Sequence, residues 1–286
     1  MSAQSPKILF PVDFSHRCML AARHVKTWAD RFSAILSTLH VVDPKAFGRD
    51  ESIYNDLSNL VAKCAADLKH FSDHYLGENV ARPTVLIGNA ESQIEHFAKR
   101  EKVGLIMLPR THQSIGSRLL RDSWAATILE RSGASVWMTE HVETADKSSI
   151  NSILCPVHFE RDLTLDSQNH RILRIVLTLA RTFQAKVTFL TVIDRREEDT
   201  TRHPQNSIVS SGIGPWLTHA REQLGNGAEF LRQTGNVVSA ITDAANRVAA
   251  DLVVVGRTRR GAIGLGRQNR ILKIDDGVHR PILSVW

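Results

Sequence analysis

The sequence predicts an α/β protein of two domains, each with a five-stranded parallel sheet covered by helices on both faces. Short apolar runs alternate with longer stretches of helical periodicity along the 286 residues, as in parallel strands joined by crossover helices. The same series of elements occurs twice, in the same order. Because this length suits two domains better than one, we place the domains at residues 1–146 and 147–286.

The elements of the first half follow from their apolar patterns. Lys7–Asp13 is an apolar run that ends in a polar residue, as in a buried strand, and Ser15 can cap a helix that runs to about Phe32. Gly88 and Asn89 break the chain before a later helix. The other predicted elements are strands at 34–42, 83–87, 105–108 and 135–138, and helices at 52–76, 90–101 and 118–131.

The second half repeats the first block by block, which indicates a tandem duplication. The matched blocks are Ile8–Phe14 with Ile153–Phe159, Phe32–Asp43 with Phe183–Asp194, and Gly88–Pro109 with Gly235–Gly256. The boundary falls near the polar stretch 144–149. Residues 195–211 are polar and are interpreted as a mobile loop before a helix at about 213–225.

Composition excludes several classes of protein. The chain is 42% hydrophobic and 23% charged, which is typical of a soluble globular protein. It has no apolar run long enough to span a bilayer and no signal pattern at its start, so we expect a cytoplasmic protein without a membrane partner. Cys18, Cys64 and Cys155 share no metal-binding or redox spacing and are interpreted as small buried hydrophobic residues.

The net charge of +6 belongs to the second half. Residues 1–146 carry 17 basic and 17 acidic side chains, whereas residues 147–286 carry 19 and 13. Most of the excess falls in residues 257–280, in a Gly- and Arg-rich stretch that directly follows the predicted strand at 252–256. Ligands of open α/β sheets bind where strands end and helices begin, so this stretch is a candidate anion site.

Motifs for catalysis are not found. Gly261–Gly266 has the spacing Gly-x-x-Gly-x-Gly and follows the fourth strand of its half, so we reject a dinucleotide-binding interpretation. The chain has no Cys-x-x-Cys pair, no Gly-x-Ser-x-Gly motif and no Walker loop. We therefore predict no catalytic residue and no metal ligand, and we do not favour an enzyme.

Each half resembles the universal stress protein family, and the whole chain is similar to its tandem two-domain members. The resemblance rests on Pro11–Asp13 at the end of the first strand, on Val41–Asp43 at the end of the second, and on the Gly88–Asn89 turn. It implies two Rossmann-like domains of the flavodoxin-like, adenine nucleotide alpha hydrolase-like type.

Family members that bind ATP have a phosphate loop of Gly-x-x-Gly, nine residues, and then Gly-Ser or Gly-Thr, in which bare backbone N–H groups close on the phosphates. In the first half these positions are Pro109, His112 and Asp122-Ser123. In the second half they are Gly256, Arg259 and Asn269-Arg270, or for this last pair one residue earlier, because this half is one residue shorter in that region. The resemblance implies a set of candidate nucleotide-binding residues: Pro11, Asp13, Val41, Ser123, His158, Val192, Gly256, Arg257, Arg259, Arg260, Gly261, Asn269 and Arg270.

Neither half keeps the complete motif, so we expect a non-enzymatic stress-response regulator or scaffold with weak or altered nucleotide binding and no certain cofactor. The alternative is an ATP- or ADP-binding protein that uses Asp13 in the first half or Arg257, Arg259 and Arg260 in the second. A further alternative is a polyanion binder through 257–280, although nucleic acid is disfavoured because no aromatic residues interleave with the arginines. We expect the two domains to pair with each other through their last strands. The other expected partners are a second copy of the chain and a small anionic ligand.

Overall fold

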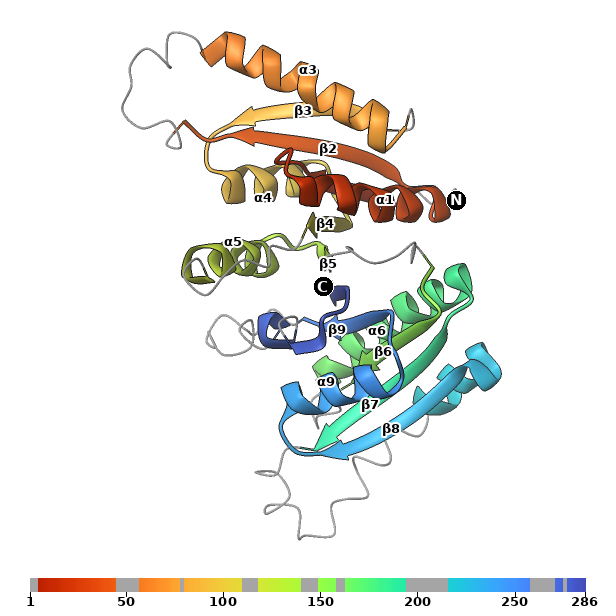
Figure 1. Ribbon diagram of the computed structural model, residues 1–286. Helices are drawn as coiled ribbons and strands as arrows, with labels where there is room; N and C mark the ends of the chain where they lie inside the picture. The colour runs from red at the N-terminus through yellow and green to blue at the C-terminus, as the bar shows by residue number, and fades with distance from the viewer. Residues whose placement is uncertain are drawn as a thin grey trace. The chain divides into compact units, whose positions relative to one another are not determined.

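The computed structural model describes residues 5–44, 57–77, 80–109, 118–139, 149–157, 163–193, 216–257, 271–274 and 277–286, without the side chains of 82, 118–124, 139 and 163–168. The chain divides into two compact units, Met1–Ser148 and Ser149–Trp286 (Figure 1). Each unit is an α/β domain with a parallel sheet, which confirms the predicted fold class. Within the described residues, no helix is both long and apolar enough to cross a membrane.

The first unit has the strand order β3-β2-β1-β4-β5. Its strands are β1 (Lys7–Pro11), β2 (Ile35–Val42), β3 (Val80–Ile87), β4 (Leu105–Pro109) and β5 (Ser135–Thr139). Its helices are α1 (His16–Arg31), α3 (Leu57–Tyr75), α4 (Ala90–Arg100) and α5 (Arg118–Arg131). Helix α1 packs beside α3, and α4 packs beside α5, on the two faces of the sheet. The chain runs outward from β1 to β3 and then returns to β4, so the strand order reverses between β1 and β4.

The second unit repeats this topology as β8-β7-β6-β9-β10. Its strands are β6 (Ser152–Pro156), β7 (Lys186–Ile193), β8 (Ala228–Thr234), β9 (Leu252–Gly256) and β10 (Ile282–Val285). Its helices are α6 (Leu163–Phe183), a helix at 216–224, α9 (Val237–Arg247) and a short helix at 271–274. The strand register is repeated too, since Pro11 lies opposite Leu39 as Pro156 lies opposite Leu190.

Strand β3 begins earlier than predicted. The sequence predicts that this strand begins at Pro83. In the structure it begins at Val80, and the register with β2 shifts by one residue between the pairs Ser37–Ala81 and Leu39–Thr84. This bulge includes Pro83 and lies on an edge strand, where a missing N–H is tolerated.

The two cores place a large and a small side chain at the same pair of facing strand positions, but on opposite strands. On β1 and β2 the facing pair is Phe10 and Thr38, whereas the equivalent pair on β6 and β7 is Cys155 and Phe189. All four residues are buried. Thr38 Oγ1 forms a hydrogen bond of 3.0 Å with Ser72 Oγ on α3, so its buried hydroxyl is satisfied. Each core therefore fills the same space with one large and one small residue, on opposite strands of the pair.

Glu95 joins the two helices on one face of the first unit. Its Oε1 lies 2.6 Å from Lys99 Nζ on α4, and its Oε2 lies 3.1 Å from Arg131 Nε on α5. The carboxylate side chain is 11% exposed, while both partners reach solvent. The hydrogen bond from Lys99, followed by the nearby charges, outweighs desolvation and lowers the pKa of Glu95.

We expect Glu95→Gln to lower the free energy of unfolding of the first unit by about 1 kcal/mol at neutral pH. A depressed folded-state pKa stabilises the fold above the unfolded value, near about 4.3, and this contribution disappears as pH falls through the folded-state pKa. The difference between wild type and variant, measured by urea unfolding, should therefore shrink below about pH 4.5. Glu101→Gln removes an exposed pair with Arg100 and should cost less. A Glu95→Gln effect that does not change with pH would contradict this account.

Candidate functional site

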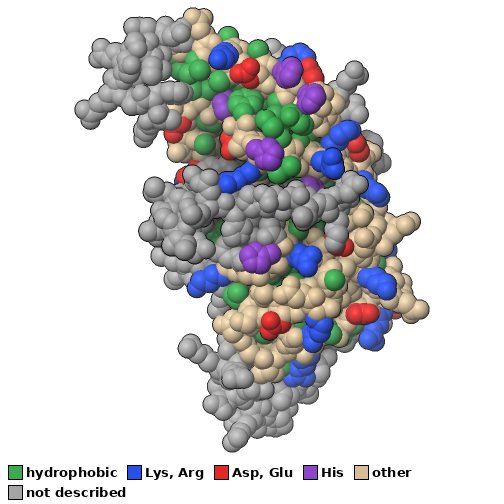
Figure 2. Space-filling view, in the orientation of Figure 1, with side chains coloured by type: hydrophobic (Ala, Val, Ile, Leu, Met, Phe, Trp, Pro, Cys, Tyr) green, Lys and Arg blue, Asp and Glu red, His purple; other side chains and the backbone are tan. Residues whose placement is uncertain are grey.

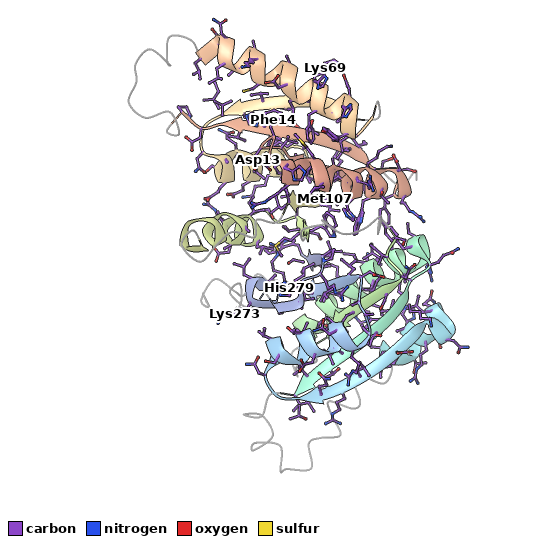
Figure 3. All side chains as sticks on the ribbon, in the orientation of Figure 1. Asp13, Phe14, Lys69, Met107, Lys273 and His279 are labelled. Atoms are coloured by element: carbon purple, nitrogen blue, oxygen red, sulfur yellow. The ribbon has the colours of Figure 1, made fainter. Side chains whose placement is uncertain are left out.

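The candidate site lies at the carboxyl edge of each sheet, beside the point where the strand order reverses. In the first unit this edge is formed by the ends of β1, β2 and β4 and by the turn that enters α4. Figure 3 labels Asp13 and Phe14, which follow β1 after Val12. Open α/β sheets bind ligands at this edge, because strand ends and helix N-termini leave polar backbone groups there.

Asp13 is held in place by its own strand-to-helix turn. Its Oδ1 accepts the Ser15 N–H at 2.9 Å and the Cys18 Sγ–H at 2.9 Å. Desolvation raises the pKa of the carboxyl, but the hydrogen bonds from Cys18 and Ser15 lower it by more, so the pKa lies below its usual value. Burial, with the adjacent carboxylate, raises the pKa of Cys18 to about 12. Asp13 is thus an oriented carboxylate that is ionised at neutral pH, and Cys18 is a thiol that donates to it.

Phe14 stands in a strained backbone conformation beside Asp13. Its φ is +58°, in the left-handed region that costs a bulky residue about 1 kcal/mol or more. The ring lies 4.6 Å from the His40 ring and packs edge-on against Phe71 at 6.3 Å. His40 Nδ1 lies 2.7 Å from the Val12 carbonyl oxygen, and because a carbonyl only accepts, Nδ1 carries the hydrogen. These contacts fix the turn that presents Asp13.

The backbone of this edge is the same in both units. Val12 donates its N–H to Leu39 O at 2.8 Å, and the equivalent Val157 donates to Leu190 O at 2.8 Å. The turn glycines, Gly88 and Gly235, have φ of +134° and +138°, which L side chains rarely adopt. The next residue, Asn89 or Asn236, caps the following helix through its side-chain oxygen. The predicted Gly-Asn turn is therefore confirmed in both halves.

At the position of the family's phosphate loop in the first unit, β4 ends with Pro109. Its nitrogen carries no hydrogen, so it cannot donate to a phosphate oxygen at the position of the first glycine of the family loop. The loop that follows, residues 110–117, lies outside the described residues. Ser123 lies on α5, but its side chain is not described.

On the phosphate side of the second unit, the donors of Arg257 are directed into the protein. The Arg257 N–H donates to Val285 O at 2.8 Å, which extends the pairing of β9 with β10. Its guanidinium lies over the ring of Trp286, at 4.7 Å from the ring centroid. The residue is only 7% exposed, and burial lowers the pKa of Arg257 to about 10. Arg257 is still charged at neutral pH, but it packs as an internal residue.

We expect Arg257→Ala to lower the free energy of unfolding of the second unit by about 1–2 kcal/mol, because the buried stem and the cation–π contact are lost. Binding of phosphate or ATP should not change. Lys273→Ala removes the same charge from an exposed side chain and should cost less than about 0.5 kcal/mol. Both effects are measured by urea unfolding with peptide-resolved hydrogen exchange. Weaker phosphate binding with unchanged stability would instead make Arg257 a ligand residue.

The structure brings together only part of the predicted site. Pro11, Asp13 and Val41 lie at the carboxyl edge of the first unit, while Val192 and Gly256 lie on β7 and β9 of the second. His158, Arg259, Arg260, Gly261, Asn269 and Arg270 lie outside the described residues. The predicted mobile loop at 195–211 lies outside them as well. In the basic segment 257–280, Lys273 is exposed and Arg257 is buried.

Sequence reasoning missed the residues that support Asp13. Cys18 was interpreted only as a small buried residue; it is buried, and its thiol also donates to the carboxylate. Phe14 and His40 were not singled out. Polar His40 stands within the apolar run of β2, where it was the one available signal, but its contact with Phe14 depends on the turn conformation.

The fold and the duplicated edge define a tandem α/β protein of the Rossmann-like class. The universal stress protein family matches residues 5–140 and 152–266, and the chain belongs to this family. The chain is similar in structure to a universal stress protein from Archaeoglobus fulgidus, with a TM-score of 0.71, 13% identity, and 99% of each chain covered.

Two further structures are similar to the chain over most of its length. A functionally unknown protein from Pseudomonas aeruginosa gives a TM-score of 0.66 at 17% identity, with 98% of this chain and 92% of that chain covered. The cytoplasmic domain of a prokaryotic cation chloride cotransporter gives 0.57 at 12% identity, with 98% and 95% covered. At such identities the likeness concerns the fold alone. No curated protein matches the chain.

Proposed function

We propose that this tandem universal stress protein is a non-enzymatic regulator or scaffold of the cytoplasmic stress response, in which nucleotide binding is weak or altered. In this proposal the first domain keeps the base-side carboxylate of Asp13, and neither domain keeps a full set of phosphate donors. The domains pair within the chain through their last strands, and two chains associate further. A small anionic ligand is a further expected partner.

The observation that carries the proposal is the condition of the backbone N–H donors at the carboxyl ends of β4 and β9. Pro109 has no N–H, and the N–H of Arg257 is already bonded to Val285 O. In the first domain a phosphate would lack the backbone donor at the first glycine position of the family loop, and in the second domain it would lack the donor that directly follows Gly256. Since a hydrogen bond to a charged group contributes about 1.5–3 kcal/mol, this loss weakens triphosphate binding substantially.

A second candidate function, an ATP- or ADP-binding protein, is favoured by the base side of the first domain. The Asp13 carboxylate is oriented by two hydrogen bonds before any ligand arrives, so a ligand that donates to it pays little ordering entropy. This supports residual recognition of a base or ribose. It does not supply phosphate donors.

The test is a titration of the purified chain with ATP, ADP and adenosine, together with mass spectrometry of small molecules released on denaturation. The proposal expects no co-purifying nucleotide, weak binding, and similar affinity for adenosine and ATP, because the phosphates add little. Asp13→Ala should remove the residual binding, whereas Asp30→Ala, which removes an exposed carboxylate paired with Lys26 on α1, is the control and should leave it unchanged. Tight binding that strengthens from adenosine to ATP would overturn the proposal in favour of the second candidate.

A further inference from the structure

Two histidines on α3 form a parallel pair that the carboxyl-edge site does not use. His70 and His74 are four residues apart, so they lie one turn apart on the same face of the helix. Their ring centroids are 6.2 Å apart and their planes are inclined by 3°. Both residues are exposed, while Leu68, Phe71 and Ser72 form the buried face of the same helix. Figure 2 shows histidine side chains on the surface of the first unit.

The orientation of the pair is set by neighbours on the helix. The His74 ring meets Tyr75 edge-on, at 4.6 Å and 85°. Tyr75 in turn packs on buried Phe71 at 4.9 Å. Beside the pair, Lys69 Nζ lies 2.5 Å from Asp73 Oδ2, so the carboxylate of Asp73 balances the charge of this lysine. The two imidazoles are thus held in parallel, next to a compensated charge.

We propose that His70 and His74 form an exchangeable site for a divalent transition metal ion, of the group that includes Zn²⁺ and Cu²⁺. Histidines at positions i and i+4 present their ring nitrogens on one helix face, where a single ion can bind both. Imidazole suits Zn²⁺, Cu²⁺ and Ni²⁺ and does not suit Mg²⁺ or Ca²⁺. The pair is already aligned without the metal, so little side-chain entropy is lost on binding.

The site supplies two protein ligands. Among the described residues, no group of three or more His, Cys, Asp or Glu side chains is placed to hold a metal ion. Water or an external ligand would fill the remaining positions, as in open metal sites, so the ion would exchange readily. The sequence prediction of no metal ligand overlooked the spacing His70-Phe-Ser-Asp-His74.

The test is calorimetric titration of the full chain with ZnCl₂ and, separately, CuCl₂. His70→Ala or His74→Ala should each weaken the tightest binding event by about tenfold, because one ion can then no longer bridge two linked ligands. Cu²⁺ should bind more tightly than Zn²⁺. Circular dichroism of each variant checks that the exposed substitution leaves the helix intact.

Two controls distinguish metal binding by this pair from metal binding by surface histidines in general. His96→Ala removes another exposed histidine, whose ring bonds to the Ser92 carbonyl on α4, and should leave binding unchanged. The double variant His74→Ala/Ala65→His keeps the number of histidines on α3 but places them five residues apart, and should not restore binding. The proposal is overturned if the His70→Ala/His74→Ala variant binds Zn²⁺ as the wild type does, or if the five-residue spacing restores affinity.

Discussion

Replacing Phe10 by Ala is expected to lower the free energy of unfolding of the first unit by about 3–5 kcal/mol, because a large ring is removed from a closed core. Phe10 is 0% exposed on β1, and its ring lies 6.3 Å from that of Phe71 on α3. Urea unfolding followed by hydrogen exchange, resolved by peptide, should show early opening of β1, β2 and α3 only.

The duplication supplies matched controls for this experiment. Cys155 occupies the equivalent position of the second unit, and Cys155→Ala should cost only about 1 kcal/mol, since its partner Phe189 already fills the space. The exchange Phe10→Cys/Thr38→Phe copies the second unit's arrangement into the first. The double variant should be more stable than the sum of the single changes predicts. The remaining loss in the free energy of unfolding should come from the Ser72 hydroxyl, which loses its hydrogen bond when Thr38 is replaced. Strict additivity would show that the two positions do not share one space.

Restoring the glycines of the phosphate loop in the first half is expected to raise the affinity for ATP by about a hundredfold, through one recovered backbone donor together with the removal of a bulky side chain and of a repelling charge. The variant is Pro109→Gly/His112→Gly/Asp122→Gly. It provides an N–H at position 109, removes the bulk of the histidine, and removes a negative charge where phosphate oxygens would lie in the family's loop. Ser123 already matches the final residue of the motif. Calorimetry with ATP, ADP and adenosine measures the change.

The pattern across ligands identifies the cause. Adenosine affinity should not change in the restored variant, because the substitutions act on phosphates alone. Asp13→Ala in the restored background should weaken all three ligands similarly. Asp122→Gly alone measures how much the negative charge weakens ATP binding, and its gain in ATP affinity should fall as the salt concentration rises. If the full variant binds ATP no better than the wild type, the loop sequence is not what limits binding, and the proposed function loses its main support.

The supports of Asp13 show where prediction from sequence ended. The carboxylate and its strand were predicted from the ending Pro11-Val-Asp13, which lies at a strand terminus in any α/β order. The roles of Phe14, His40 and Cys18 were not, because they depend on a positive φ at Phe14 and on contacts of the turn after β1 with β2, α1 and α3. A local pattern carries no information on which neighbouring ring will meet a strained turn.

Arg257 marks the same limit on the phosphate side. Its position after β9, next to Gly256, followed from the repeat, and the basic composition of the segment suggested an anion site. Its orientation depends on Trp286, which is 29 residues further along the chain and stacks under the guanidinium. Only the pairing of β9 with β10 brings these two residues together.

By itself the sequence determined the class of fold, the duplication and the order of the elements, and it predicted the carboxyl edge as the place of the candidate site, because these follow from periodicity, turn residues and repeated motifs. The tertiary structure decided which side chains support Asp13, that the Arg257 N–H after β9 is already bonded, and how the exchanged pairs Phe10–Thr38 and Cys155–Phe189 fill equivalent cores. The physical reason is that hydrogen bonding and packing are satisfied between residues far apart in the chain, and a repeat can preserve the backbone while it redistributes side-chain volume.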